Sequence, residues 1–445
     1  MFIAPTVLSI FLVDVIALQR ETIVSIKSGN NDVEVRRLPH MRMDAGHIPD
    51  QNIASALRVA KVITLEYVGF QVVQSSTLPI DCRSLCSLVT AASRKLSLQS
   101  MCTKDANGGL YGGRSTPEEK RTKKRLPCYD SELHVNDPDA PRQEYLFLME
   151  MGKVWPLALK HGTREVKVAV IDSGIDWKDR DLAPLKRRLK KKSGGYIEGG
   201  WNVYDDSPHM TTGHDHGAAV CRVLAAKINN SFGLAGVAPN VALVPLQFVN
   251  DNYHAPLSKL IEAINMAIDL QVDVAVMSFG YTYNPLGGTG WYMLRRALHS
   301  LQTKNILVVS AAGNGNKQAH DILPCAYGGS KGICVGYLQS WNPRQLNHRT
   351  NWGVQVDFAA YATHICVGRD ADGNCIRESG SSFAAPMVAG IAAILLSMGV
   401  EPTMVKRMME NCADPVTSYN RQSIRSGAID ALRTIQHAIR QLHSR

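Results

Sequence analysis

Long apolar runs and aromatic residues are both scarce in this sequence of 445 residues. Outside residues 2–18, no segment approaches the ~20 apolar residues of a membrane-spanning helix, so we expect no stable membrane span. Aromatic residues make up only 7% of the chain, and the basic runs that carry much of its net charge of +10 are not interleaved with them. This pattern argues against nucleic acid as a partner. The runs, at 120–125 and 186–192, are typical of solvated loops that a protease can cut.

The N-terminus and the cysteines indicate the compartment. Residues 2–18 are apolar and have the length of a signal peptide, although no Lys or Arg precedes them and Asp14 interrupts them. We therefore expect residues 1–18 to be a cleaved signal peptide; the alternative is a strand-forming N-terminus. Ten cysteines fit an oxidising compartment, which favours secretion or the secretory pathway. Two close pairs are each spaced to close a short loop, namely Cys325 with Cys334 and Cys366 with Cys375.

The composition changes along the chain and indicates two folded units. Residues 19–98 mix strand-like and helical patterns, which is typical of a small α+β unit. Residues 99–140 are rich in Gly, Ser, Pro, Asp and charge, and indicate a linker. From residue 166 onward, continuously apolar strand-like runs alternate with helical ones. Strands of this kind are buried on both faces, so we predict an α/β fold with a parallel sheet covered by helices.

Four polar residues occupy positions at which either a structural or a chemical role fits. Asp172 ends the apolar run "VKVAVID" and either caps a turn or orients a histidine ring. His216 begins the segment "HGAAVCRVLAA", which is a weak signal by itself. Ser382 precedes a long apolar helix, where serine is normally an N-cap, but where a nucleophile would also gain from the helix N-terminus. Asn314 follows a strand-like run and is either a turn residue or a donor to an oxyanion.

The order and contexts of these four residues together resemble the subtilisin-like serine proteases. Asp, His and Ser follow one another in the order of the subtilisin triad, one of three convergent orders. The likeness covers roughly residues 136–440. The family patterns DSGID, HGTxVAG, MSxG, AAGN and GTSxAAPxVAG are matched, in full or in part, by residues 172–176, 216–222, 277–280, 311–314 and 380–390.

The resemblance implies a serine endopeptidase that acts on proteins or peptides through an acyl-enzyme. In that enzyme Ser382 attacks the carbonyl carbon, His216 takes and returns the proton, and Asp172 holds the imidazole. The side-chain amide of Asn314 and the main-chain N–H of Ser382 bind the oxyanion. An apolar pocket floor would favour apolar substrate side chains. The implied substrate contacts are the strand Ser278, Phe279 and Gly280, the pocket wall Ala311, Ala312 and Gly313, and the pair Ile322 and Leu323 near the floor.

The resemblance also implies how the chain is organised and made. It implies a doubly wound, mostly parallel sheet with helices on both faces, preceded by a small α+β prodomain. Residues 19–127 are then the prodomain with its linker, and residues 128–445 are the peptidase domain. The chain would be a zymogen that cuts itself between about 99 and 135, with Arg125 as a candidate site. The released prodomain would inhibit the enzyme, which we expect to be a monomer.

A structural calcium ion is the only cofactor that the resemblance implies, with Asp181 and Asn230 as possible ligands. The sequence departs from the family motifs beside two catalytic positions. Ala218 and Arg222 replace the threonine and the last glycine of the histidine motif, and Ser381 replaces the threonine before the nucleophile. Because of these departures, a catalytically inactive homologue that acts as a protein-binding module stays an alternative.

Two other enzyme classes fit the sequence less well. The ligands of a metal hydrolase would be His209, His214, Asp215 and His216. A His-x-His pair can chelate a metal, but no further ligand lies at an expected spacing. An α/β-hydrolase needs a GxSxG elbow with Asp and His downstream, whereas "GSSFA" lacks the last glycine and leaves little chain after Ser382.

Overall fold

The computed structural model describes residues 132–443, except 212, 340–343 and 419–421, and in the N-terminal part only residues 67–68 and a set of strands. The candidate cleavage site Arg125 and the basic run 120–125 lie outside the described residues. The N-terminal strands are β1 (Leu8–Asp14), β2 (Ile23–Gly29), β3 (Asp32–Leu38), β4 (Arg42–Met43), β5 (Lys61–Leu65), β6 (Phe70–Ser75), β7 (Ser100–Lys104), β8 (Gly109–Leu110) and β9 (Gly113–Arg114).

A parallel sheet of eight strands forms the centre of the large unit. Its order is β13-β14-β10-β15-β17-β19-β20-β23, and every neighbouring pair is parallel. Along β10, Val168 and Val170 pack in one apolar cluster and Ala169 and Ile171 in another, because successive side chains of a strand point to opposite faces. The two buried faces explain the continuously apolar strands. The bounds are β10 (Val166–Asp172), β13 (Trp201–Asn202), β14 (Val241–Gln247), β15 (Val274–Met277), β17 (Leu307–Ala311), β19 (Gly332–Tyr337), β20 (Phe358–Ala360) and β23 (Gly427–Ala428).

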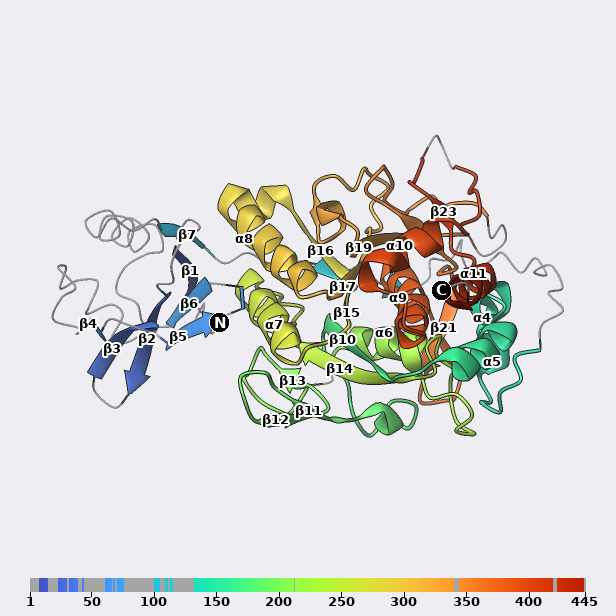
Figure 1. Ribbon diagram of the computed structural model, residues 1–445, viewed down its shortest axis with the longest axis horizontal. Coiled ribbons are helices and arrows are strands. Elements are labelled where there is room, and N and C mark those ends of the chain that lie inside the picture. The colour runs from blue at the N-terminus through green and yellow to red at the C-terminus, as the bar shows by residue number, and fades with distance from the viewer. Residues whose placement is uncertain are drawn as a thin grey trace.

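Helices cover both faces of this sheet, so the predicted α/β fold is confirmed. Helices α7 and α8 share an apolar cluster with one face, and α5, α6, α9, α10 and α11 share one with the other. Helix α9 is buried along its whole length, because it packs against α6 as well as the sheet (Figure 1). The bounds are α4 (Glu144–Leu148), α5 (Met151–His161), α6 (His216–Ala225), α7 (Leu257–Asp269), α8 (Tyr283–Thr303), α9 (Ser381–Ser397), α10 (Pro402–Glu410) and α11 (Ala431–His443), with short 3-10 helices η2 (Ala140–Arg142), η3 (Ala183–Leu185) and η4 (Cys325–Tyr327).

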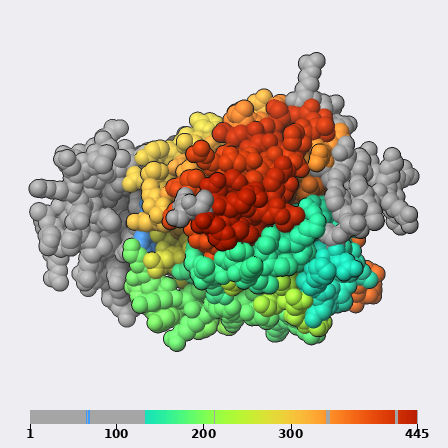
Figure 2. Space-filling model, turned by 45° about the vertical axis from the view of Figure 1, so that its right-hand side comes forward, coloured from blue at the N-terminus to red at the C-terminus, as the bar shows by residue number. Residues whose placement is uncertain are grey.

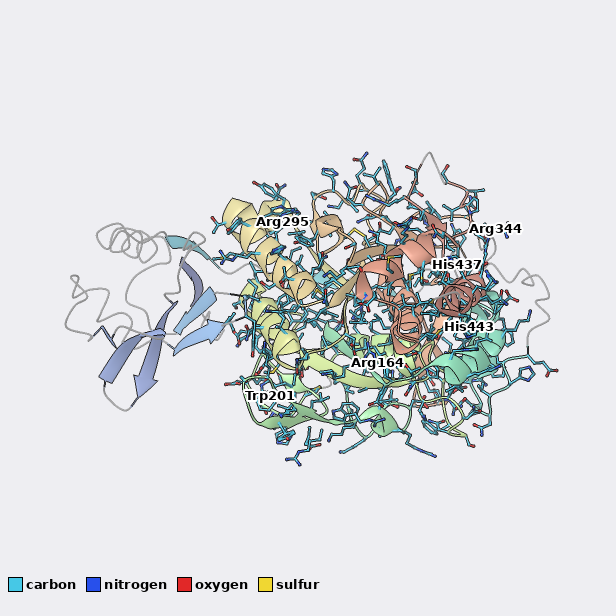
Figure 3. All side chains as sticks on the ribbon, viewed as in Figure 1. Arg164, Trp201, Arg295, Arg344, His437 and His443 are labelled. Atoms are coloured by element: carbon cyan, nitrogen blue, oxygen red, sulfur yellow. A yellow bond between two sulfur atoms is a disulfide. The ribbon has the colours of Figure 1, made fainter. Side chains whose placement is uncertain are left out.

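Helices from the two ends of the large unit lie side by side. Helix α11 packs against α5, and Figure 2 shows the red C-terminal helices next to the blue-green segment that contains α4 and α5. Charged side chains such as Arg164, Arg295 and Arg344 lie at the exposed periphery of the layers (Figure 3). Arg164 pairs there with Asp273 at 3.0 Å. Among the described residues, no helix is long and apolar enough to cross a membrane.

A second sheet, of order β5-β6-β1-β7, lies in the N-terminal part. Its strand β1 pairs antiparallel with both β6 and β7 and lies inside the expected signal peptide. Loss of residues 1–18 would therefore leave β6 and β7 without their shared partner, and cleavage at that point stays a prediction. Tyr67 contacts helix α7, since its main-chain N–H donates to Asn265 Oδ1 at 2.8 Å and its hydroxyl to Asp269 Oδ1 at 2.9 Å.

Two N-terminal strands join small sheets of the large unit instead. Strand β8 pairs antiparallel with β16 (Phe279–Thr282), which also pairs with β18 (Ile322–Leu323). Strand β9 pairs antiparallel with β22 (Cys375–Ser379), which also pairs with β21 (Ile365–Arg369). Elsewhere, β2, β3 and β4 form one antiparallel sheet, and β11 (Arg188–Lys190) and β12 (Tyr196–Glu198) form a hairpin within the second basic run and the residues after it.

Both expected disulfides are present. Cys325 and Cys334 are joined with Cα atoms 4.8 Å apart, and Cys366 and Cys375 with Cα atoms 5.4 Å apart. Cys221, on helix α6, is a buried free thiol. Burial raises the pKa of this thiol well above its ordinary value, and the nearby carboxylate of Asp172 adds to the shift. Cys221 therefore stays protonated and packs as an apolar side chain.

Candidate active site

Asp172 and His216 meet at the carboxyl end of β10 and the first residue of α6. The Nδ1 atom of His216 lies 2.8 Å from Asp172 Oδ1, and both side chains are almost fully buried. The same carboxylate oxygen accepts a 2.7 Å hydrogen bond from the main-chain N–H of Ser173. The opposite ring nitrogen, Nε2, is buried without a hydrogen-bond partner among the described residues. Asp172 therefore fixes one side of the imidazole and leaves the other nitrogen ready to accept a proton.

The main chain on either side of His216 is held by two neighbouring side chains. The main-chain N–H of Gly217 donates to Ser173 Oγ at 2.9 Å, and that hydroxyl donates to the main-chain oxygen of His214 at 3.0 Å. The main-chain N–H of His216 donates to His214 Nδ1 at 3.0 Å. A Cβ atom at position 217 would lie only 2.7 Å from the main-chain oxygen of Gly174. The glycine after the histidine is therefore required by close approach to the end of β10.

His214 takes part in positioning, which the sequence pattern did not indicate. Its ring packs edge-on against Tyr253, with centroids 4.0 Å apart. Burial lowers the pKa of His214, and the neighbouring His216 lowers it further, which favours the neutral form that accepts the hydrogen bond. Among the residues that the structure describes, no three His, Cys, Asp or Glu side chains gather to hold a metal ion. The geometry gives no support to the metal-hydrolase alternative.

Ser382 lies in the first turn of α9, directly after the turn formed by Gly380. Gly380 has a φ of 142°, which favours glycine. The Ser382 hydroxyl donates to the main-chain oxygen of Ser278 at 2.9 Å, and the Ser278 hydroxyl donates to the main-chain oxygen of Ser382 at 2.8 Å. The ring of His216 lies against Phe383, with centroids 5.7 Å apart. The imidazole is therefore at the start of α9, while the Ser382 hydroxyl is bonded to Ser278.

Asn314 and Ser381 form a hydrogen-bonded unit beside Ser382. Asn314 Oδ1 accepts from both the main-chain N–H and the hydroxyl of Ser381, at 3.0 and 2.9 Å. The Ser381 hydroxyl in turn accepts from the main-chain N–H of Gly313 at 2.9 Å. The amide oxygen of Asn314 is thus turned toward Ser381, and its NH₂ group is turned away. The hydroxyl that survives where the family has threonine is the group that sets this orientation.

Two of the segments expected to bind substrate contact the start of α9, since Ser278 is bonded to Ser382 and Gly313 to Ser381. Phe279 packs its ring on Phe248 in the core, with centroids 4.7 Å apart, so it anchors the strand that begins after Ser278. Asn351 holds the segment after β17, because its side-chain amide donates to Ala312 O and its N–H to Gly313 O, both at 2.9 Å. The other expected residues are Gly280 in β16, Ala311 at the end of β17, and Ile322 and Leu323, which are fully buried in β18.

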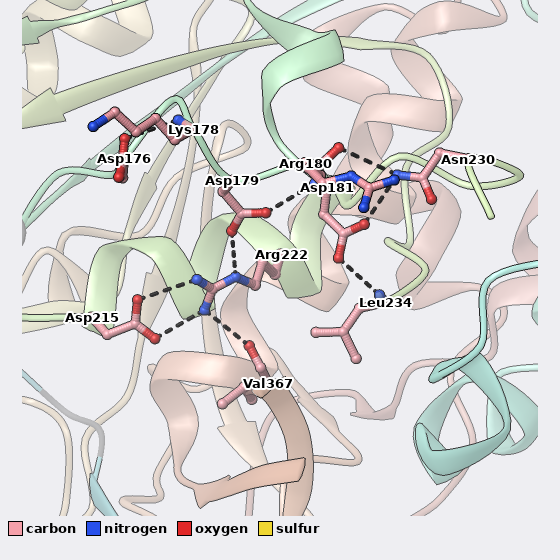
Figure 4. Close-up of polar contacts among 10 residues, drawn as sticks. All are labelled: Asp176, Lys178, Asp179, Arg180, Asp181, Asp215, Arg222, Asn230, Leu234 and Val367. Atoms are coloured by element: carbon pink, nitrogen blue, oxygen red, sulfur yellow. Dashed lines mark hydrogen bonds and ion pairs between the residues drawn. The ribbon is translucent and has the colours of Figure 1, made fainter. Parts of the chain in front are cut away.

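The expected calcium ligands hydrogen bond to each other and to the main chain (Figure 4). Asp181 accepts from Asn230 Nδ2 at 3.0 Å and from the N–H of Leu234 at 2.8 Å, and Asn230 Oδ1 accepts from the N–H of Phe232 at 2.8 Å. Burial raises the pKa of Asp181 to about 6, although the bonds from Leu234 and Asn230 oppose the shift. Calcium needs six to eight oxygen ligands, whereas these oxygens all face N–H donors. The pair as arranged does not fit a calcium ion.

Arg222 replaces the last glycine of the family's histidine motif and makes new contacts (Figure 4). Its Nε donates to Asp179 Oδ2 at 2.7 Å and its Nη1 to Asp215 Oδ2 at 2.9 Å, and Nη1 also reaches Val367 O at 3.4 Å. Burial alone would lower the pKa of Arg222, but the two carboxylates raise it above its ordinary value. Arg222 therefore ties the residue before His216 to the loop after β10. The other departure, Ala218, lies in α6 and is buried in the core.

Comparison with known proteins gives a family and a fold. The sequence model of the Subtilase family matches residues 163–428. The chain is 27% identical to thermitase of Thermoactinomyces vulgaris over 303 residues, which are 68% of this chain and 99% of thermitase. It is 31% identical to a subtilisin of Bacillus pumilus over 257 residues, which are 57% of this chain and 84% of the subtilisin.

Solved structures support the same fold. Fervidolysin from Fervidobacterium pennivorans, described as a keratinolytic enzyme related to subtilisin, superposes with a TM-score of 0.68 at 17% identity over 97% of this chain and 61% of its own. A protease of Pseudoalteromonas arctica superposes with a TM-score of 0.52 at 23% identity over 68% of this chain and 99% of its own. The family match covers more than half of the chain, and the fold agrees with it. The chain therefore belongs to the subtilase family and is a subtilisin-like serine endopeptidase.

Proposed function

We propose that the chain hydrolyses peptide bonds with Ser382 as nucleophile, His216 as general base and Asp172 as the group that orients the imidazole. The observation that carries the proposal is the 2.8 Å contact between the buried Nδ1 of His216 and Asp172, which leaves Nε2 without a partner among the described residues. A buried nitrogen of this kind is costly unless it has a use. Proton transfer from a serine hydroxyl is the use that this position beside the start of α9 supports.

In the proposed reaction the Ser382 hydroxyl leaves the main-chain oxygen of Ser278 and turns to His216 Nε2. As Oγ attacks the substrate carbonyl carbon, Nε2 accepts the hydroxyl proton and the imidazole becomes positive. Asp172 stabilises this cation across its contact with Nδ1. The proton then passes to the leaving amine, and a water molecule, activated by the same nitrogen, hydrolyses the acyl-enzyme and regenerates Ser382.

The negative charge on the tetrahedral intermediate would be held by two N–H donors. One is the main-chain N–H of Ser382, at the positive end of α9. The other is the side-chain amide of Asn314, whose NH₂ group is turned away from Ser381. Such donors act on charge that develops only in the transition state, so they raise kcat more than they affect substrate binding.

We also propose that the chain is made as a secreted zymogen. Two disulfides support an oxidising compartment. The partners would be protein or peptide substrates and the chain's own prodomain, and the mature enzyme would be a monomer. No step of the proposed reaction uses a metal, and the calcium ligands Asp181 and Asn230 stay a prediction that their present hydrogen bonds do not favour.

A catalytically inactive homologue that binds proteins is the second candidate. The observation that favours it is the hydrogen bond of Ser382 Oγ to Ser278, because the hydroxyl is not bonded to His216 in this arrangement. The replacement of a glycine by Arg222 on the same helix adds to it.

A serine-directed fluorophosphonate probe distinguishes the two candidates. We expect the wild-type protein to be labelled at Ser382, the Ser382→Ala variant to stay unlabelled, and the His216→Ala variant to be labelled very slowly. Ser330→Ala is the matched control, because it removes an exposed serine hydroxyl that has no part in the proposed site. Labelling that survives in Ser382→Ala would overturn the assignment, and a folded, processed wild-type protein that is never labelled would favour the inactive homologue.

A further inference from the structure

One buried side chain, that of Asn351, is hydrogen bonded to the main chain on both sides of Asn314. Asn351 is only 1% exposed and lies in the segment between β19 and β20. Its Nδ2 donates to the main-chain oxygen of Ala312 at 2.9 Å. Its Oδ1 accepts from the main-chain N–H groups of Gly315 and Lys317, at 2.9 and 3.1 Å. A single amide group therefore spans the stretch from Ala312 to Lys317, which we call the Asn314 loop.

Main-chain hydrogen bonds hold the same two segments together. The main-chain N–H of Asn351 donates to the oxygen of Gly313 at 2.9 Å, and that of Trp352 donates to the oxygen of Lys317 at 3.0 Å. Gly313 has a φ of 101°, which favours glycine. The Asn314 loop is thus fixed along its length to the segment that contains Asn351.

The side chain of Asn314 is held separately, by Ser381. Its Oδ1 accepts from the main-chain N–H and the hydroxyl of Ser381, which sets the orientation of the amide. This orientation places the NH₂ group correctly only while the main chain at Asn314 stays in position. A preorganised donor depends on accurate placement, and a shift of about 1 Å can cost about 10²-fold in rate.

We propose that Asn351 is a positioning residue for the hydrolysis of peptide bonds. It holds the main chain before and after Asn314, so that the Asn314 amide meets the developing oxyanion. The inference rests on the proposed function, in which Asn314 donates to the tetrahedral intermediate. Asn351 acts through the Asn314 loop, because its side-chain amide bonds to main-chain atoms of that loop.

The groups around the side chain explain why the residue is an asparagine. The Asn314 loop presents one main-chain oxygen and two N–H groups to it. A side-chain amide supplies a donor for the oxygen and an oxygen that can accept from both N–H groups. Aspartate has nearly the same size and would keep the two accepted bonds, but it would turn an oxygen toward the oxygen of Ala312. Alanine would leave all three groups without this partner.

The expected wall of the substrate pocket has supports of its own. Ala311 is the last residue of β17, and the main-chain N–H of Ala312 donates to the oxygen of Val335 in β19 at 2.9 Å. Loss of the Asn351 side chain should therefore displace Asn314 more than the wall. For this reason we expect kcat to change much more than KM.

Peptide hydrolysis by Asn351→Ala gives the first test, with the enzyme concentration taken from sites labelled to completion by the fluorophosphonate. We expect kcat to fall about 10–100-fold, with a change in KM of less than about threefold. Asn347→Ala is the matched control, because Asn347 is also buried in the segment between β19 and β20. Its amide donates to Gln339 and Thr363 instead, so kcat per labelled site should stay close to the wild-type value. An equal kcat in Asn351→Ala and wild type would overturn the inference.

A double-mutant cycle shows whether Asn351 acts through Asn314. In the Asn314→Ala background, the further Asn351→Ala substitution should change kcat less than about threefold, because the donor that Asn351 positions is already absent. If the two single losses multiply instead, Asn351 acts on the structure in some other way and the inference is wrong.

The isosteric Asn351→Asp substitution provides the test if the alanine variant does not fold. It keeps the bonds to Gly315 and Lys317 and loses the donor to Ala312, so we expect kcat to fall about 10-fold. This loss should disappear in the Asn314→Ala background, whereas a direct effect of the added charge would remain there and would contradict the inference.

Failure of this inference is distinguishable from failure of the proposed function. If wild type is labelled at Ser382 and hydrolyses peptides, but substitution of Asn351 leaves kcat unchanged, the inference fails and the proposed function stands. If folded wild type is neither labelled nor able to hydrolyse any peptide, the proposed function fails and the role of Asn351 fails with it.

Discussion

The two parts of helix α6 are held in place by different interactions. At its first residue, His216 is fixed by Asp172 and by short-range bonds through Ser173 and His214. Further along the same helix, Arg222 is held by two carboxylates that approach from separate loops, Asp179 and Asp215. The first part begins with the His-Gly pair of the family motif, although Ala218 departs from it, and the second carries Arg222 in place of the motif's last glycine. The difference shows that ion pairs hold the later part of the helix without contacting the groups that hold the imidazole.

Substitution of Asp172, which contacts the first residue of α6, gives the strongest test of the difference between the two parts of this helix. The Asp172→Asn substitution keeps the size of the side chain but favours the wrong imidazole tautomer and cannot stabilise its cation, so we expect kcat to fall by about 10⁴-fold. Hydrolysis of a fluorogenic peptide measures the effect. Asp176→Asn, an exposed carboxylate in the same motif, is the control and should leave kcat unchanged. If Asp172→Asn kept more than a tenth of the activity, the role proposed for Asp172 at the start of α6 would be wrong.

The oxyanion donors should give the next largest effect. Asn314→Ala should lower kcat by about 10²–10³-fold with little change in KM, as measured for loss of such a donor in a subtilisin. Ser381→Ala should lower kcat by about 10-fold, because it removes the hydroxyl that orients the amide of Asn314. Ser381→Thr, which keeps that hydroxyl, should behave like wild type. Equal activities of the alanine and threonine variants would contradict the orienting role.

At Arg222 we expect a loss of stability rather than of activity. Arg222→Ala removes three hydrogen bonds to the two carboxylates, so the free energy of unfolding should fall by about 2 kcal/mol. The kcat of the folded enzyme should change less than threefold, because Arg222 touches neither Asp172 nor His216. Urea denaturation and peptide hydrolysis measure the two quantities, and Arg222→Lys should recover part of the stability. A collapse of kcat at unchanged stability would show that the two parts of α6 are not independent.

The smallest effect concerns pH at Asp181. Its folded pKa of about 6 is above the ordinary value for an unfolded aspartate, so the folded protein binds more protons between these two values. The stability that protonated Asp181 contributes is fully present below pH ~4 and is lost as the pH rises through about 6. Relative to Asp181→Asn, the wild-type free energy of unfolding should fall by about 1–2 kcal/mol between pH ~4 and ~7.

The wild-type protein and the Asp181→Asn variant also test the prediction that Asp181 and Asn230 bind calcium. Unfolding is measured in calcium chloride and in EDTA. We expect equal stability in both solutions, because the oxygens of Asp181 and Asn230 face N–H donors. Stabilisation of wild type by calcium that Asp181→Asn abolishes would contradict this arrangement and would support these residues as ligands.

Much of the fold and of the candidate site is predictable from the sequence because the signals are local. The apolar run that ends at Asp172 is a strand buried on both faces, and Gly217 and Gly380 stand where close approach or a positive φ requires glycine. The family match and the fold confirm the recognition that these motifs support. The catalytic roles themselves stay predictions, although Asp172 and His216 do lie together.

The motifs did not predict the contacts between segments that are far apart in the sequence. The sequence suggested His214 only as a ligand of the metal-hydrolase alternative, yet its ring packs on Tyr253. The replacement at Arg222 was visible, but its partner Asp179 was not. The indication of a carboxylate partner for Arg222 was chemical, because a buried arginine requires negatively charged groups nearby.

The sequence by itself determined the family, the parallel sheet and the positions of the candidate catalytic residues, because each is carried by local patterns. It suggested the two short disulfide loops, and the structure joined them. Only the tertiary structure decided which oxygen Ser382 bonds to and how Asn314 is turned. Those outcomes depend on which distant main-chain groups meet. Residue type and spacing do not encode that geometry until the sheet and its edges have formed.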